Sequence, residues 1–332
     1  MRPTYSFIVP IYNRPEELRE LLESISQLSG KIPFEVIVVE DGSTISSEEI
    51  AAEFSKKLNI RYFYKENTGP GDSRNFGMKN AHSDYFLILD SDVLLPPQYL
   101  QEVNFFLKEN HVECFGGRDA AHESFGDLQK AINYVMTSFL TTGGIRGDKK
   151  AAKNFEPRSF NMGISRKAFE ATGGFGKIHP GEDPDLSLRI KKMGFSTAFA
   201  PKVFVYHKRR IDWQKFYVQV NKFGKARPIL TSWHRGSEKL VFWLPGLFML
   251  ALLFSIILSF FSIFWPLGIY IVYFLVVFLD AAIKNKSIFI GILALRALLT
   301  QFFGYGLGFF TSTFYIRLLR KEPKNAFPDL FF

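Results

Sequence analysis

The chain has 332 residues, more than one hydrophobic core usually organises, and a formal net charge of +9. Residues 1–200 contain 24 basic and 27 acidic side chains, residues 201–239 contain 10 and 2, and residues 240–332 contain 7 and 3. The acidic first part argues against a nucleic-acid-binding protein. The basic excess adjoins the apolar C-terminal part, which favours membrane lipids with anionic headgroups as the partner.

Strand and helix patterns alternate through the first part of the chain. The pattern predicts strands at 5–9, 34–39, 60–64 and 85–89, with helices at 16–28, 47–58 and 72–80. This alternation predicts an α/β fold with a mostly parallel sheet and flanking helices. After residues 96–108 the pattern becomes less regular, a further strand is predicted at 113–117, and residues 119–158 are expected to be irregular.

The location of the first domain is predicted from its cysteine content and its beginning. Cys114 is the only cysteine, so one chain cannot form an internal disulfide, which fits a reducing compartment. The first residues run into a strand pattern and lack the apolar core of a signal peptide. We therefore expect this domain to stay in the cytoplasm.

A pair of carboxylates ends the fourth predicted strand, in the sequence Asp90-Ser91-Asp92. Ligands of open α/β sheets bind outside the carboxyl ends of strands, and two carboxylates are typical ligands of Mg²⁺ or Mn²⁺. The spacing alone is equally compatible with turn or helix-capping residues. Polar segments follow the other strands too: Pro10-Ile-Tyr12-Asn13-Arg14, Glu40-Asp41-Gly42-Ser43 and Gly71-Asp-Ser-Arg74-Asn75-Phe-Gly77.

The order and spacing of these segments resemble the nucleotide-sugar glycosyltransferases of family 2, which have the GT-A fold. The resemblance covers about residues 4–210. It continues through Phe160-Asn-Met-Gly163-Ile-Ser-Arg166, Gly181-Glu182-Asp183 and Val205-Tyr206-His207. It implies an inverting transfer from a nucleotide-diphosphate sugar.

The resemblance also implies roles for the donor side of the site. Asp41 would hydrogen-bond the nucleotide base, and Arg74 would contact the donor diphosphate through its guanidinium fork. The alternatives are a turn-forming Asp41 and an Arg74 in a helix-surface ion pair. The nucleotide-sugar-binding residues implied are Pro10, Tyr12, Asn13, Asp41, Arg74, Asn75 and Asp90.

The catalytic and metal residues follow from the same resemblance. Asp183 would be the general base that takes the proton of the acceptor hydroxyl, with Glu182 sharing the acceptor site. The alternative role of Asp183 is that of an N-cap for a helix that starts at Pro184. Asp90, Asp92 and His207 would hold Mg²⁺ or Mn²⁺, although a histidine after an apolar strand is often only structural.

A long apolar region fills the C-terminal part. Residues 240–283 contain only one charged side chain, Asp280, and Trp265-Pro266 is a natural break between predicted spans at 240–262 and 266–283. A third apolar segment, 288–316, contains Arg296. We expect about three transmembrane or re-entrant helices, and the third segment is alternatively an interfacial helix pair.

Basic and aromatic residues alternate at helical spacing between 207 and 227, which favours a helix in the headgroup layer over a solvated basic helix. Processive polysaccharide synthases of the family carry a Gln-x-x-Arg-Trp motif near here. In this chain Gln219 is followed by Val-Asn-Lys-Phe. This departure argues against a processive polymerase and for addition of a single sugar.

Together these patterns predict three parts: a GT-A domain at 1–210, a basic interfacial linker at 211–239 and a membrane region at 240–332. The predicted function is transfer of one sugar to a hydroxyl of a lipid-linked or membrane-proximal glycan, in synthesis of envelope polysaccharide or glycolipid. Alternatives are transfer to a polyprenyl phosphate and a non-catalytic nucleotide-sugar-binding membrane module. The expected location is the inner (plasma) membrane, with the catalytic domain in the cytoplasm.

Overall fold

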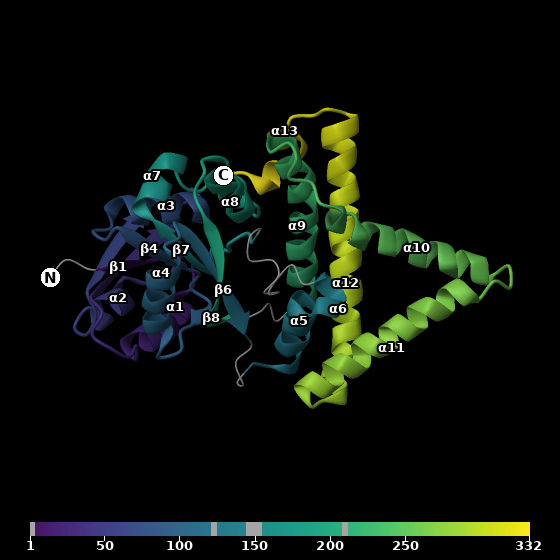
Figure 1. Ribbon diagram of the computed structural model, residues 1–332, viewed down its shortest axis with the longest axis horizontal. Helices are drawn as coiled ribbons and strands as arrows, with labels where there is room; N and C mark the ends of the chain where they lie inside the picture. Colours follow the sequence, from purple (N-terminus) through teal and green to yellow (C-terminus); the bar gives the residue numbers. More distant parts are fainter. Residues whose placement is uncertain (1–3, 121–124, 144–154, 208–211) are drawn as a thin grey trace. The chain divides into compact units, whose positions relative to one another are not determined.

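The computed structural model describes residues 4–120, 125–143, 155–207 and 212–332 (Figure 1). The chain forms two compact units. The sheet unit comprises residues 1–122, 147–208 and 332, and the helical unit comprises residues 123–146 and 209–331. The predicted boundary at residue 210, with the basic run 208–210, lies outside the described residues. The predicted division into domain, linker and membrane region therefore stays a prediction.

An eight-stranded sheet with the order β3-β2-β1-β4-β7-β6-β8-β5 forms the centre of the sheet unit. Strands β1 to β4 run parallel, whereas β7 is antiparallel to β4 and β6, and β5 is antiparallel to β8. The α/β prediction is confirmed, and the sheet is mixed. The strands are β1 (Tyr5–Ile11), β2 (Phe34–Asp41), β3 (Ile60–Lys65), β4 (Tyr85–Leu89), β5 (Val93–Leu94), β6 (Cys114–Ala120), β7 (Asn161–Ser165) and β8 (Thr197–His207).

Helices cover both faces of this sheet because its central strands are apolar on both faces. Alternate residues of a strand point to opposite sides, so Phe7 and Ile8 of β1 belong to two separate hydrophobic clusters. Helix α1 contributes Leu18 and Leu22 to the first cluster. The helices are α1 (Pro15–Ser26), α2 (Glu48–Phe54), α3 (Pro70–Asn80), α4 (Tyr99–Asn110), α7 (Arg166–Thr172) and α8 (Glu182–Lys192).

The helical unit contains two helices that the sequence analysis did not predict. Residues 119–158 were expected to be irregular, but they contain α5 (Asp127–Thr137) and α6 (Phe139–Thr142). The buried residues Ala131, Ile132 and Val135 of α5 share a hydrophobic cluster with C-terminal helices. Their helical spacing was a signal that the prediction missed. The other helices are α9 (Trp213–Trp233), α10 (Leu244–Ser259), α11 (Trp265–Asn285), α12 (Ile288–Thr313) and α13 (Pro323–Ala326), with a 3-10 helix at Leu240–Phe242 and a π-helical turn at Phe314–Leu318.

Two helical segments of this unit are long and apolar enough to cross a bilayer. They are Trp265–Asn285, with a mean hydropathy of 2.1, and Ile288–Leu318, with a mean hydropathy of 1.7. Helix α10 is apolar too, but its 16 residues are fewer than a span needs. Length and composition thus make α11 and α12 candidate spans.

Candidate active site

The sheet brings Asp90, Asp92 and His207 together at one edge. Asp90 directly follows β4, and His207 is the last residue of β8. Short β5 pairs antiparallel with the end of β8, which sets Val93 opposite His207. One potential ligand atom from each of the three residues lies within 4.8 Å of the others. The structure therefore joins residues that are 117 positions apart in the sequence (90 to 207).

The donor atoms of this cluster suit a divalent cation. His207 Nε2 lies 3.3 Å from Asp92 Oδ1, and the imidazole stacks on Phe160 with 4.8 Å between ring centroids. The buried Nδ1 of His207 has no hydrogen bond within the described part of the chain. Two carboxylates and an imidazole are ligands that Mn²⁺ and Mg²⁺ accept. The residues present thus fit the predicted metal.

Arg74 links this cluster to the acidic start of α8. Its Nη2 donates to Asp90 Oδ1 at 2.7 Å, and its Nη1 donates to Glu182 Oε1 at 3.1 Å. Burial alone would lower the pKa of Arg74, but the charges of Asp90 and Glu182 outweigh it and raise the pKa. The side chain is buried, so the alternative of a helix-surface ion pair is wrong.

Glu182 and Asp183 are neighbours with opposite pKa shifts. Burial would raise the pKa of Glu182, but His179, whose Nδ1 lies 2.8 Å away, and Arg74 lower it to about 2. Burial is the largest cause that raises the pKa of Asp183, the charge of Glu182 is the next, and the pKa reaches about 6. The two shifts give one ionised carboxylate and one that titrates near neutral pH, a pattern typical of acid–base sites.

The start of α8 determines how Asp183 is presented. Helix α8 begins at Glu182, and Gly181 occupies the N-cap position. The alternative that Asp183 caps this helix is therefore wrong. Its buried Oδ1 makes no hydrogen bond to any described residue. A carboxylate oxygen without such a partner is suited to accept a proton.

Asp41 lies at the end of β2 and is buried. Its Oδ1 accepts hydrogen bonds from Lys65 Nζ at 2.6 Å and Thr68 N at 3.1 Å, and its Oδ2 accepts one from Gly69 N at 3.0 Å. These contacts tie the loop after β3 to the end of β2. The predicted contact of Asp41 with a nucleotide base stays a prediction.

The other predicted donor residues differ in their surroundings. Asn13 Oδ1 accepts from the backbone N–H groups of Thr44 and Ile45, which joins the loops after β1 and β2. Asn75 exchanges two hydrogen bonds with the backbone of Phe175. Tyr12 is exposed, whereas Pro10 lies inside β1.

Three further residues of this edge had no assigned role in the sequence analysis. Lys65 pairs with Asp41, His179 pairs with Glu182, and Arg14 Nη1 lies 3.5 Å from Asp92 Oδ2. His179 precedes Glu182, the first residue of α8, by three positions, and this spacing was the one local signal for their contact. Lys65 and Arg14 reach their partners only through strand order.

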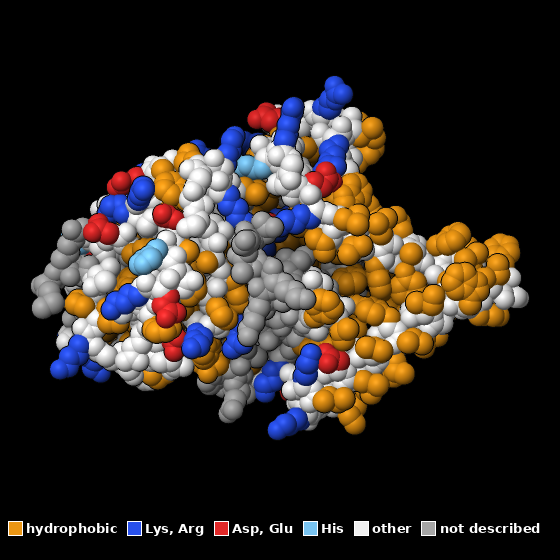
Figure 2. All heavy atoms as spheres, viewed as in Figure 1, with side chains coloured by type: hydrophobic (Ala, Val, Ile, Leu, Met, Phe, Trp, Pro, Cys, Tyr) orange, Lys and Arg blue, Asp and Glu red, His pale blue; other side chains and the backbone are white. Residues whose placement is uncertain are grey.

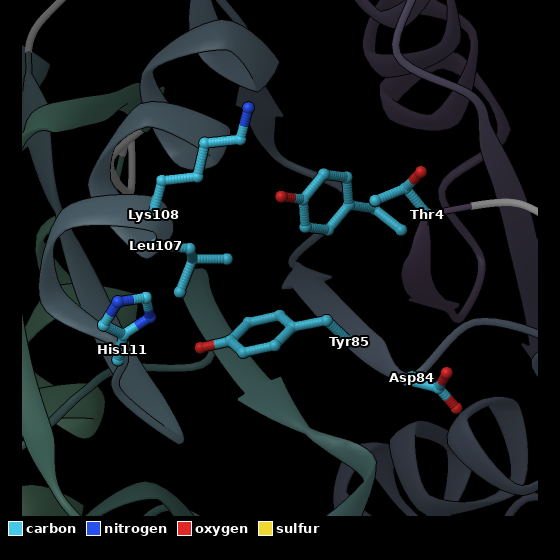
Figure 3. A pocket seen from close by; sticks show the side chains of 7 residues that line it. Thr4, Asp84, Tyr85, Leu107, Lys108 and His111 are labelled. Atoms are coloured by element: carbon cyan, nitrogen blue, oxygen red, sulfur yellow. The ribbon is translucent and has the colours of Figure 1, made fainter.

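A pocket of about 570 Å³ lies away from this edge, where β1 and β4 begin (Figure 3). Tyr85 lines it from β4, and Leu107, Lys108 and His111 line it from α4 and the residue after it. Its lining includes none of the predicted site residues. The candidate site is thus the cluster of charged groups at the carboxyl ends of the strands.

The sequence model of "Glycosyl transferase family 2" matches residues 6–173, half of the chain. The chain is 36% identical over 148 residues to poly(ribitol-phosphate) β-N-acetylglucosaminyltransferase TarS of Staphylococcus aureus, covering 42% of the chain and 26% of TarS. It is 40% identical over 234 residues to glycosyltransferase GlyA of Streptococcus pneumoniae, covering 68% of the chain and 32% of GlyA. The alignments thus span at most a third of these relatives' length.

Solved structures have the same fold. Mannosyltransferase PcManGT of Pyrobaculum calidifontis, solved with GDP-Man and Mn²⁺, aligns with 97% of this chain and 89% of its own at a TM-score of 0.59 and 17% identity. TarS residues 1–349 of S. aureus with UDP-GlcNAc align with 94% of this chain and 91% of their own, at a TM-score of 0.51 and 19% identity. The predicted GT-A-like fold is confirmed.

Proposed function

Because the chain belongs to glycosyltransferase family 2, we propose that it transfers a single sugar from a nucleotide-diphosphate sugar to a hydroxyl of a lipid-linked or membrane-proximal glycan. The observation that carries this proposal is the chain of contacts from Asp92 and His207 through Asp90 and Arg74 to Glu182. It connects a candidate metal site to a carboxylate that titrates near neutral pH, Asp183. An inverting transfer needs a base beside the acceptor hydroxyl and positive charge beside the diphosphate of the donor.

Asp183 takes the proton of the acceptor hydroxyl in this proposal. Its pKa near 6 keeps it deprotonated at neutral pH and basic enough to bind the proton. Glu182 stays ionised and holds Arg74 in place. Asp90, Asp92 and His207 would hold Mg²⁺ or Mn²⁺, which when bound supplies positive charge for the departing nucleotide diphosphate.

The donor side of the proposal uses residues at the ends of β1 and β2 and two residues of α3. Asp41, with Pro10, Tyr12, Asn13 and Asn75, forms the nucleotide part of the site, and Arg74 adds a guanidinium for the diphosphate. PcManGT, of the same fold, is solved with GDP-Man and Mn²⁺, and TarS is solved with UDP-GlcNAc. These structures support a nucleotide-diphosphate sugar as the donor class.

The helical unit attaches the enzyme to the inner (plasma) membrane in this proposal, with the sheet unit in the cytoplasm. The support is the apolar surface of α10 and α11 (Figure 2) and the basic residues before them. A membrane-bound enzyme meets lipid-linked acceptors directly at the bilayer surface.

Donor screening tests the proposal. Detergent-purified protein with Mn²⁺ should release nucleoside diphosphate from one nucleotide sugar in a panel when acceptor lipid is present. The variant Asp183→Asn should lose about a hundredfold to ten-thousandfold of this turnover. Near-normal turnover of that variant would instead favour a polyprenyl phosphate acceptor, which is already an anionic nucleophile. Donor binding without turnover would indicate a non-catalytic module.

A further inference from the structure

Helices α9 and α12 of the helical unit run side by side in the same direction (Figure 1). Arg296 of α12 lies 4.4 Å from the ring centroid of Trp213, the first residue of α9. Arg317, which follows α12, donates a hydrogen bond to Thr231 near the end of α9. Between these points, Asn221 Nδ2 donates to the carbonyl of Gly304 at 3.0 Å. The two helices therefore lie at the same depth of any membrane that they enter.

Glycines allow this close approach. A Cβ atom on Gly224 would collide with the carbonyl of Tyr305, and one on Gly308 would collide with the carbonyl of Asn221. Backbones in such contact leave no room for lipid between the helices. The pair thus moves as one body, and the charges of α9 limit the positions of α12.

Those charges lie opposite the C-terminal half of α12. Lys222, Lys225 and Arg227 follow Asn221 on α9, and a Cβ on Gly308 would lie 3.1 Å from the backbone nitrogen of Lys225. A transmembrane α12 would carry these cations into one half of the hydrocarbon layer. A charged side chain is unfavourable in the hydrocarbon layer unless it is paired there. Asp329 pairs with Lys222 and Lys225, at 3.6 and 4.0 Å, but is itself charged and half exposed.

An orientation parallel to the membrane removes this cost. Exposed apolar side chains recur at Ile292, Leu299 and Leu307 of α12 and at Phe314 directly after it, and this spacing of seven or eight residues sets them on one face of the helix. That face can contact acyl chains while the cations of α9 stay among the headgroups.

The hairpin of α10 and α11 leaves this pair sideways (Figure 1). Its two arms contact α12 near Gly306 and Gly291, and they meet at a loop of exposed aromatic residues, Phe260, Phe261, Phe264 and Trp265. At about 1.5 Å per residue, α10 extends about 20 Å and α11 about 26 Å from these contacts to the loop. The two contact points on α12 lie about 22 Å apart and form the base of a triangle. Such a triangle is about 20 Å deep, less than the hydrocarbon thickness of about 30 Å.

We propose that α9 and α12 lie in the headgroup layer of an anionic bilayer, and that the α10–α11 hairpin enters the hydrocarbon without reaching the opposite surface. This inference rests on the membrane attachment in the proposed function and replaces the candidate spans α11 and α12 with a one-sided insertion. Lys286 and Lys321, at opposite ends of α12, then lie on the same side of the membrane as the sheet unit. Asp280, a charged residue of the hairpin, lies at its base and accepts from Tyr134 and Lys284.

Cysteine labelling tests this orientation. Single variants Lys56→Cys, Lys286→Cys, Lys321→Cys and Ser262→Cys are made at exposed positions, and Cys114 is kept because it is buried. A membrane-impermeant maleimide is added to spheroplasts and to inverted membrane vesicles of an expressing bacterium. Unsubstituted protein is the control for labelling of Cys114.

The inference expects Lys286→Cys and Lys321→Cys to label in the same preparation as Lys56→Cys in the sheet unit. Ser262→Cys, at the hairpin tip, should label in neither preparation until detergent is added. Labelling of Lys286→Cys and Lys321→Cys from opposite sides would show that α12 spans the membrane and overturn the inference. Labelling of Ser262→Cys in either intact preparation would also overturn it.

A second measurement uses a double variant, Phe261→Glu with Phe264→Glu. Its retention in membranes after an alkaline carbonate wash should be lost, whereas the matched control Phe105→Glu, an exposed phenylalanine of α4, should be retained like the unsubstituted protein. Full retention of the double variant would contradict insertion of the tip. Transferase turnover is measured separately, so the orientation can fail while the proposed function stands.

Discussion

The two units of the molecule deal with charge in opposite ways. In the sheet unit, Arg74, Glu182 and Asp41 are buried and hydrogen-bonded at the carboxyl ends of strands. In the helical unit, the buried side chains of the described residues are uncharged, mostly glycine and apolar residues with a few serines and threonines, and the large exposed surface of the hairpin is apolar too. Buried charge is costly and is kept where chemistry uses it, whereas exposed apolar surface indicates a surrounding without water.

This comparison predicts that changes at the edge of the sheet affect turnover, and that changes in the helical unit affect stability or membrane binding. The largest effect is expected for Asp92→Ala. Loss of a metal ligand should reduce turnover by about a thousandfold, since a bound cation contributes several kcal/mol to the departure of the diphosphate. Turnover is measured as release of nucleoside diphosphate over a range of Mn²⁺ concentrations.

The matched control is Glu49→Ala, an exposed carboxylate of α2, which should keep normal turnover. A chelator should reproduce the loss in unsubstituted protein. Full turnover of Asp92→Ala in the presence of chelator would remove the metal from the proposed mechanism.

Arg74→Lys should have the next largest effect. Lysine keeps the charge, but its single ammonium group cannot reproduce the planar fork that reaches Asp90 and Glu182 together, so we expect about a hundredfold loss of turnover. Arg19→Lys is the control because Arg19 forms a surface pair with Glu53 at 2.8 Å. Equal turnover of both variants would show that the fork is not needed.

The pH dependence of turnover should report Asp183. Only its deprotonated form acts as a base, and burial together with the charge of Glu182 raises its pKa to about 6. Turnover should therefore be constant above that pH and fall about tenfold per unit below it. In Glu182→Gln, loss of the neighbouring negative charge should lower the pKa of Asp183. The fall in turnover should then begin at a lower pH. If turnover of that variant begins to fall at the same pH as that of the unsubstituted protein, the titrating group is not Asp183.

The smallest effect is expected in the helical unit, for Tyr134→Phe. The change removes the hydrogen bond of 2.6 Å to Asp280 and should lower the free energy of unfolding by about 1 kcal/mol. Tyr64→Phe, in an exposed tyrosine of β3, is the control. Thermal unfolding in detergent should show a decrease of about 2 °C for Tyr134→Phe, with turnover unchanged at lower temperature. A large loss of turnover would show that the helical unit takes part in the chemistry.

The sequence alone determined the α/β alternation and the approximate positions of the first four strands and first three helices. The predicted strand 85–89 is the same as β4, and the other predicted strands differ from the observed ones by a few residues. Periodicity of apolar residues is a local property, so it can be interpreted without knowing the fold. The Asp-x-Asp pair was visible for the same reason, because it directly follows a strand, whereas the Glu-Asp pair was identified through the family resemblance.

Tertiary structure decided which of these segments meet. The antiparallel insertion of β7 and the pairing of β5 with β8 bring His207 to Asp92, and the position of α8 brings Glu182 to Arg74. The opposite pKa shifts of Glu182 and Asp183 depend on burial, which only the packed structure supplies, on the neighbouring charges of His179 and Glu182, and on Arg74, which is 108 positions before Glu182 in the sequence. The membership of α5 in the helical unit was equally invisible, since an amphipathic helix does not specify which surface covers its apolar face.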